Sequence, residues 1–264
     1  MQILAVPLAR QRATAKTYLF YAVRASQAEK EKGPPIQPSL TQRMMNRASA
    51  FWINLGRTDV RSVWNWRRRT FLLGERIMDR VPYQEWELKN IDQELGPSIR
   101  SILEAHKQKK ETSPLQVEYA PQLTGASEAV NSLGTLEKDR KPYHFRYFLY
   151  SMIGIPITAP LFLVPVIPNF VTYYLMWRAW SHWRAYATAN ELTVLLQKNL
   201  IEPVPNSELD DFLAARQASE ALNGWDLYLQ RDHIVPLVKT FGLSSQGAID
   251  LRRAHEQILQ KIQK

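Results

Sequence analysis

The sequence predicts a mainly α, membrane-associated helical protein with a Pro-broken apolar hairpin or a kinked transmembrane segment. The first observation is an uncharged run from Tyr147 to Trp177, in a chain in which 22% of the residues are charged. The second is the helical spacing of apolar side chains through much of the remaining sequence. One straight span needs about 20 residues and two need about 40 with a turn, so the length of the run matches neither one straight crossing nor two.

Four prolines interrupt the uncharged run, namely Pro156, Pro160, Pro165 and Pro168. Because each proline removes a backbone donor and clashes with the preceding turn, one regular helix cannot continue through the middle of the run. We expect a break between Ile155 and Asn169, where protein or water must satisfy the freed backbone groups. Asn169 is the best candidate in this loop for an interhelical hydrogen bond.

Basic residues flank the run on both sides and give no orientation signal for a single crossing. They are Arg140, Lys141 and Arg146 before the run and Arg178 and Arg184 after it, with no acid from Arg140 to Asn190. Two basic flanks favour a re-entrant hairpin whose ends share one membrane face. A single kinked span and an apolar segment buried in a soluble core remain open alternatives.

Aromatic residues mark both ends of the run. Tyr147 lies at its entry, and Trp177, Trp180 and Trp183 follow helical spacing at its exit, beside Arg178 and Arg184. Amphipathic rings next to arginines are typical of the lipid headgroup region, so we predict that these residues anchor the segment at the interface. The alternative is an aromatic helix face that packs against another helix.

The chain divides by composition into five segments. Residues 1–38 form a basic N-terminal targeting segment, with an extended stretch, a helix from about Arg10 to Lys30 and a linker, and its lack of acids before Glu29 resembles mitochondrial targeting composition. Residues 39–110 are predicted as a basic, Trp-rich helical region and residues 111–141 as a flexible acidic connector. Residues 142–190 contain the membrane-inserted segment and the aromatic exit helix, and residues 191–264 are a C-terminal helical region.

The formal net charge of +9 predicts attraction to polyanions, either nucleic acid or an anionic membrane surface. Much of this charge lies in residues 39–110, which include the basic surface residues Arg67, Arg68 and Arg69. Arginines opposite tryptophans on a helix are typical of an interfacial amphipathic helix. Since no zinc-finger, RNP or KH signature is present, nucleic acid is not the partner that we expect.

The sequence predicts no catalytic, cofactor-binding or metal-binding residues. The chain has no cysteine, and its five histidines do not approach ligand spacing along the sequence. Its ten glycines form neither a phosphate-binding loop nor a nucleophile elbow. We therefore expect that the protein is not an enzyme and that it carries no cofactor.

Four motifs carry a resemblance to a known family. They are GIPITAPLFLVPVIPNF at residues 154–170, RAWSHWRA at 178–185, RVPYQEW at 80–86 and ILAVPLA at 3–9. The sequence closely resembles the mitochondrial K+/H+ exchange-related family through these motifs. The resemblance implies a protein of the mitochondrial inner membrane that participates in potassium/proton exchange and organelle volume homeostasis.

The composition of the uncharged run refines this expectation. Exchangers usually place Asp, Glu or His at membrane depth, and the run contains none of them. We therefore expect a scaffold or regulatory subunit of a transport complex, with membrane lipid and other subunits as its partners and the potassium ion involved only indirectly. The alternatives are a direct K+/H+ antiporter that works as a homo-oligomer and a membrane-attached RNA- or ribosome-binding module.

Overall fold

The computed structural model describes residues 2–14, 16–23, 79–160, 170–215, 221–243 and 245–263, together with the isolated residues 69, 72 and 76. The chain divides into two compact units, one formed by Met1–Ala25 with Tyr83–Lys264 and the other by Ser26–Pro82. Nearly all of the described residues belong to the first unit, which carries the sheet, the helices and the site discussed below.

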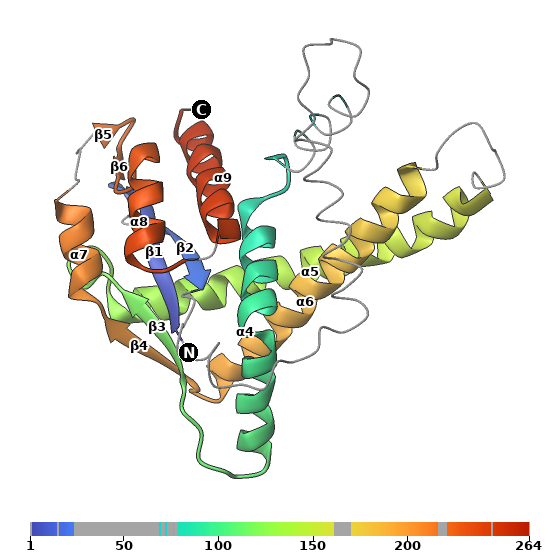
Figure 1. Ribbon diagram of the computed structural model, residues 1–264, viewed down its shortest axis with the longest axis horizontal. Coiled ribbons are helices and arrows are strands. Elements are labelled where there is room, and N and C mark those ends of the chain that lie inside the picture. The colour runs from blue at the N-terminus through green and yellow to red at the C-terminus, as the bar shows by residue number, and fades with distance from the viewer. Residues whose placement is uncertain are drawn as a thin grey trace. The chain divides into compact units, whose positions relative to one another are not determined.

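A six-stranded mixed sheet forms the centre of this unit (Figure 1). Its strands are β1 (Gln2–Gln11), β2 (Thr17–Val23), β3 (Leu115–Tyr119), β4 (Ile201–Pro205), β5 (Ala221–Leu222) and β6 (Trp225–Leu227). The strand order is β4-β3-β1-β6-β5, and β2 pairs with β1 outside this path. Strand β1 is the organising strand, because it pairs antiparallel with β2, parallel with β3 and antiparallel with β6.

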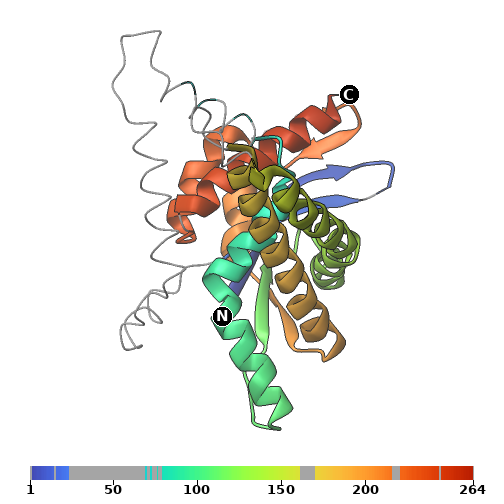
Figure 2. The ribbon, with the colours of Figure 1, turned by 90° about the vertical axis from the view of Figure 1, so that its right-hand side faces the viewer.

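The described helices pack around this sheet. They are α4 (Tyr83–Lys107), α5 (Ala126–Thr158), α6 (Phe170–Gln197), α7 (Ser207–Ala214), α8 (Ile234–Thr240) and α9 (Ser245–Ile262), with a short 3₁₀ helix at Arg231–His233. Helices α5 and α6 make the most extensive helix–helix contact and lie side by side in both views (Figures 1 and 2). Their paired ends extend beyond the sheet. We call residues 145–158 of α5 with residues 170–183 of α6 the apolar arm.

Alternating side chains of β1 supply two separate cores, one on each face of the sheet. Ile3 and Ala5 pack with residues of α4, α5 and α6, whereas Leu4, Val6 and Leu8 pack with residues of α7, α8 and α9. Every one of these β1 side chains is fully buried. Because both faces of the strand are covered by helices, its sequence is an almost continuous apolar run instead of an alternating one.

The prediction of a mainly α fold that contains a transmembrane segment is wrong. The unit is built on a mixed sheet, and among the described residues no helix combines the length and the apolar character that a membrane crossing requires. Residues 17–23, which were predicted to be helical, form β2 instead. The two strands β1 and β2 form a hairpin whose register shifts between Pro7 and Ala9, so the proline that interrupts the apolar run sits at an irregularity of the ladder.

Two further predictions concern the connector and the prolines of the uncharged run. The stretch 111–141, predicted as a flexible connector, contains β3 and the first part of α5. Helix α5 includes Pro156 and ends at Thr158, and α6 begins at Phe170, so Pro160 follows the end of α5. Pro165, Pro168 and Asn169 lie outside the described residues, as do Arg67 and Arg68.

Candidate functional site

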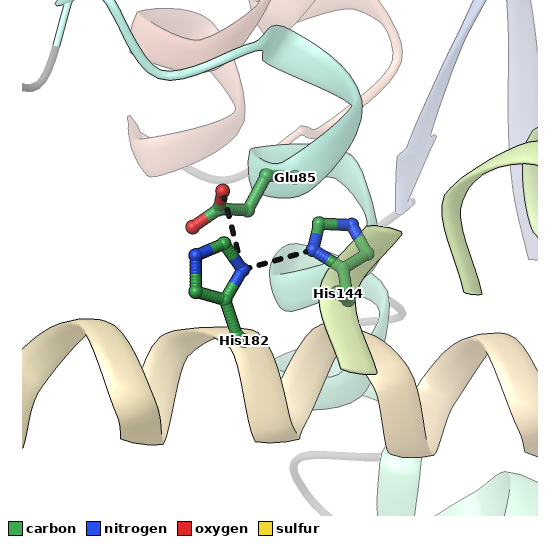
Figure 3. Close-up of side chains that lie close together, drawn as sticks. All are labelled: Glu85, His144 and His182. Atoms are coloured by element: carbon green, nitrogen blue, oxygen red, sulfur yellow. Dashed lines mark hydrogen bonds and ion pairs between the residues drawn. The ribbon is translucent and has the colours of Figure 1, made fainter. Parts of the chain in front are cut away.

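A buried polar cluster lies where α4, α5 and α6 meet at the base of the apolar arm. Its central residues are Glu85 of α4, His144 of α5 and His182 of α6, each with only 1% of its surface exposed. Figure 3 shows the three side chains pointing toward one another from the three helices. We call them, with Arg178 and Ser181, the Glu–His–His cluster.

Local helix geometry places these residues together. Glu85 lies in the first turn of α4, where a carboxylate interacts favourably with the helix dipole. Arg178 and His182 are four residues apart on α6, so they share one helix face. Helix α6 packs against both α4 and α5, and it therefore presents this face to Glu85 on one neighbour and to His144 on the other.

Arg178 neutralises Glu85. Its Nη1 donates to Oε1 of Glu85 at 2.7 Å, its Nη2 lies 3.2 Å from Oε2, and the hydroxyl of Ser181 donates to Oε1 at 2.6 Å. Burial alone would raise the pKa of Glu85, but the Arg178 charge and the Ser181 hydrogen bond outweigh it and hold this pKa below its usual range. Glu85 is therefore an ionised carboxylate in a two-pronged ion pair.

The two histidines form a hydrogen-bonded pair, with their Nδ1 atoms 3.1 Å apart. Nη2 of Arg178 lies 2.8 Å from Nε2 of His182. Because a guanidinium can only donate, Nε2 of His182 must accept, and the neutral His182 ring then carries its proton on Nδ1. That proton points to Nδ1 of His144, which leaves His144 with its proton on Nε2. Within the described part of the chain, this buried Nε2 has no hydrogen-bond partner.

Both rings are neutral at neutral pH in this arrangement. Burial is the largest effect and lowers the pKa of each histidine from 6.5 to about 4, against the opposing influence of Glu85. Arg178 contributes to this lowering at both histidines, because a second positive charge close to it is unfavourable.

Glu85, His144 and His182 also present ligand atoms within 4.8 Å of one another, which is the kind of grouping that can hold a metal ion. The surroundings do not fit one. Arg178 occupies both carboxylate oxygens, and a metal bound at Nδ1 of His182 would force the proton onto Nε2, directly against the guanidinium. The cluster is therefore organised by hydrogen bonds and one ion pair.

A second cation lies in an aromatic environment next to the cluster. The ammonium of Lys89 lies 4.1, 5.3 and 5.8 Å from the ring centroids of Trp86, Trp177 and Trp180. Burial lowers the pKa of Lys89 to about 8. These contacts tie α4 to α6 by cation–π attraction, which contributes on the order of 1 kcal/mol or more per contact when the site is partly desolvated.

The arm beyond the cluster is covered by exposed apolar side chains. Most of the exposed large apolar residues of the described chain lie on it, and on α5 the three most exposed are Tyr150 at 63%, Ile153 at 61% and Ile157 at 72%. Their spacing of three and four residues places them on one face of α5. On α6, Tyr173 is 58% and Val171 is 52% exposed.

The predicted interface anchors separate into two groups. Trp177, Trp180, Arg178 and Arg184 lie between α6 and α4, where Arg184 pairs with Asp92 and the other three meet Glu85 or Lys89. Tyr147 and Trp183 are exposed on the arm at 44% and 48%. Of the remaining predicted site residues, Pro156, Pro160 and Arg69 are exposed.

Sequence reasoning missed Glu85, His144 and His182. Ligand spacing along the chain could not reveal the pair, because 38 residues separate the two histidines. A usable signal did exist in the motifs RVPYQEW and RAWSHWRA, since each contains charged or polar residues within an aromatic context. In the structure these two motifs meet, through Glu85 with Arg178, Ser181 and His182.

The fold and the site together define an α/β protein with helices on both faces of a mixed sheet, a projecting apolar arm and a buried Glu–His–His cluster at the base of that arm. A family model described as mitochondrial K+-H+ exchange-related matches residues 2–196, which include all of the cluster and the whole arm. The chain belongs to this family.

Two curated relatives have no assigned function. An uncharacterized protein of Saccharomyces cerevisiae is 33% identical over 124 residues, which cover 45% of this chain and 39% of the yeast protein. An uncharacterized protein of Schizosaccharomyces pombe is 24% identical over 216 residues, which cover 81% of this chain and 83% of that protein. No solved structure matches the chain.

Proposed function

We propose that this protein works at the mitochondrial inner membrane as a scaffold or regulatory subunit of a complex that exchanges K+ for H+. The family description supports the exchange process. The observation that supports a subunit role is the apolar arm, an extended helical pair whose outer face is apolar and exposed.

An exposed apolar surface of this kind is costly for a protein that stays alone in water. Isolated exposed apolar residues are common, whereas contiguous patches on one helix face usually mark an interaction site. Tyr150, Ile153 and Ile157 form such a patch on α5, and Val171 and Tyr173 are further exposed apolar residues of the arm on α6. Full burial of an aliphatic side chain of this size contributes roughly 1.5–3 kcal/mol, so a few of them supply substantial binding energy.

Charge indicates what kind of surface fits the arm. No acid occurs from Arg140 to Asn190, while Arg146 is exposed on α5. The arm therefore matches an apolar surface with acidic groups near its edge, which we assign to another subunit of the exchange complex. Anionic membrane lipid offers a related chemistry and would be distinguished by the experiment below.

One observation favours the direct antiporter as a second candidate. The Glu–His–His cluster places titratable side chains in a buried position next to the arm, which is what a proton-coupled step requires. In a homo-oligomer, arms of neighbouring copies would then enclose the ion path. Arg67 and Arg68, on which the RNA-binding alternative depends, lie outside the described residues.

The subunit role is tested by changing the arm without changing the core. In the variant with Ile153→Ser and Ile157→Ser, we expect loss of the partner subunits on purification from mitochondria in mild detergent, because the apolar contact is removed. Val235→Ser is the matched control, since Val235 is 60% exposed on α8, away from the arm. It should purify with the same partners as the unchanged protein.

Three outcomes would contradict the subunit role. Partners that remain bound to the arm variant at the control level would show that the arm is not the docking surface. If no subunit copurifies, and if the purified protein binds protein-free liposomes while the arm variant does not, the arm binds lipid. Salt-sensitive RNA binding that is weakened by alanine at Arg67, Arg68 and Arg69 would favour the RNA-binding module.

A further inference from the structure

We propose that the histidine pair is a proton-binding site at which one proton and the Arg178 guanidinium compete for Nε2 of His182. This inference deepens the proposed function, on which it rests only for its biological role, because it supplies a proton-dependent regulation of the α4–α6 junction. The proton-binding chemistry itself follows from the hydrogen-bond geometry of the cluster.

The neutral pair has no free acceptor. Nε2 of His182 accepts from Arg178 at 2.8 Å, and Nδ1 of His144 accepts from Nδ1 of His182 at 3.1 Å. The other two ring nitrogens already carry protons. An incoming proton can therefore bind only by displacing one of these two donors.

Keeping the contact between the histidines determines which donor leaves. With one additional proton, the pair carries three protons on four ring nitrogens. If the Nδ1···Nδ1 hydrogen bond persists, one Nδ1 stays unprotonated as its acceptor, and both Nε2 atoms are protonated. Nε2–H of His182 then faces an N–H of Arg178, so two donors oppose each other and Arg178 must withdraw from His182. If the histidine contact breaks instead, two buried imidazoles must separate. Arg178 can move more easily, because its other nitrogen keeps the hydrogen bond to Oε1 of Glu85.

The charges around the pair oppose the proton in the present arrangement. Glu85 on α4 favours the charged form, whereas Lys89 on α4, Arg140 on α5 and Arg178 on α6 disfavour it. The rings of Tyr143 and Tyr147 on α5 pack against His182 without adding charge, and Asp250 on α9 acts on Lys89. Withdrawal of Arg178 would remove the closest opposing cation, and the proton affinity of the pair would rise.

This competition couples the proton to anything that binds Arg178. Arg178 lies on α6 at the base of the arm, with its side chain 11% exposed. An acidic group on the partner subunit that draws Arg178 outward would increase proton binding at the histidines. By thermodynamic reciprocity, protonation would strengthen that partner contact by the same factor.

The ring tautomers test the proposal directly in the full-length protein. We would label histidine with ¹⁵N, assign His144 and His182 from the signals lost in His144→Asn and His182→Asn, and titrate the remaining chain by NMR. At neutral pH we expect His182 protonated on Nδ1 and His144 on Nε2. Acidification should add one proton to the pair, with a proton appearing on Nε2 of His182.

Arg178→Met should change both readouts. At neutral pH the proton of His182 should move from Nδ1 to Nε2, and the titration midpoint should rise by about one pH unit or more, because an adjacent charge shifts a pKa by that amount. Arg184→Met removes a guanidinium from the same helix that pairs with Asp92, away from the histidines, and should leave the tautomer unchanged. If Arg178→Met does not fold, Glu85→Gln with Arg178→Met avoids the unpaired carboxylate and keeps the tautomer readout.

A wild-type His182 protonated on Nε2 at neutral pH would overturn the proposal without any variant. The proposal would also be overturned if Arg178→Met and Arg184→Met shifted the midpoint of the histidine titration equally and neither changed the tautomer of His182. These results are independent of the copurification experiment. If NMR finds the expected tautomers but no partner subunit copurifies, only the proposed function is contradicted. If a partner subunit copurifies but His182 has the other tautomer, only the proton site is contradicted.

Discussion

Individual buried residues of this protein hold unusual protonation states, and each has a physical cause on a neighbouring helix or strand. His144 and His182 are neutral because burial and Arg178 disfavour a second cation. Glu87 accepts a hydrogen bond from the backbone nitrogen of Tyr21 at 2.7 Å, and burial raises its pKa to about 8. Their titrations affect stability in opposite directions, so variants can separate them.

We predict that His144→Leu reduces the acid sensitivity of folding. The histidine pKa falls from 6.5 in the unfolded chain to about 4 in the folded protein, so the unfolded state binds more protons between these values. The stability that the neutral ring contributes is therefore lost as the pH falls from 6.5 to 4. Urea unfolding at pH 6.5 and at pH 4 gives the loss of unfolding free energy over this window. We expect this loss to be smaller in the variant than in wild type by on the order of 2 kcal/mol.

His106→Asn is the control for that measurement, because His106 lies exposed near the end of α4. It should reproduce the wild-type pH profile. Equal acid sensitivity of His144→Leu and wild type would contradict the neutral, buried state of the histidine pair.

We predict the opposite sign for Glu87. Its pKa rises from 4.5 in the unfolded chain to about 8 in the folded protein, so the folded state binds more protons and stability falls as the pH rises through this window. Glu87→Gln mimics the protonated acid and can still accept from Tyr21. Relative to wild type, it should gain on the order of 1 kcal/mol of stability per pH unit from pH 5 to pH 8 in urea unfolding. A constant difference across that range would disprove the raised pKa.

At the scale of secondary-structure elements, the junction of α4 with α6 depends on the buried pair of Glu85 and Arg178. Removing one partner leaves an uncompensated buried charge, which typically costs about 3–5 kcal/mol, whereas replacing both with apolar residues is often close to neutral. We therefore predict that Glu85→Leu and Arg178→Met each destabilise strongly and that the double variant recovers most of the loss. The check is a double-mutant cycle of unfolding free energies, and additive losses would show that the pair is not coupled.

The elements also show what the sequence could and could not predict. The aromatic helix after residue 170 was predictable because its Trp spacing is strictly helical. Strand β1 was predicted as an extended stretch before a helix from about Arg10. Strand β2 was missed because, with helices on both sides of the sheet, it lacks the alternation of a half-exposed strand. The pairing of β1 with β3 joins residues more than a hundred positions apart, which local patterns cannot reveal.

The candidate site was predictable only in part for the same reason. Trp177, Arg178 and Trp180 were predicted as anchors at the lipid interface, whereas in the structure they contact Glu85 and Lys89 of a distant helix. His144 and His182 could be seen as a pair only after α5 and α6 were placed side by side. The family resemblance, in contrast, depended on contiguous motifs and is confirmed by the family model.

At the scale of the whole molecule, the sheet and its two cores form the base from which the apolar arm projects. The exposed arm residues Ile153 and Ile157 lie outside both cores. We therefore predict that Ile153→Ser with Ile157→Ser leaves the free energy of unfolding within about 0.5 kcal/mol of wild type, as for most surface substitutions. Urea unfolding of the variant checks this, and a larger loss would mean that the arm belongs to the folded core.

In the proposed function, this chain supports K+/H+ exchange through its arm and is not itself the exchanger. The most direct test is K+-dependent proton flux in liposomes that contain only the purified full-length protein. We predict that the protein alone gives no flux above that of empty liposomes. Once the copurified partner subunits are added, we predict a flux that depends on Ile153 and Ile157. Flux from the protein alone would contradict the account and identify the chain as the antiporter.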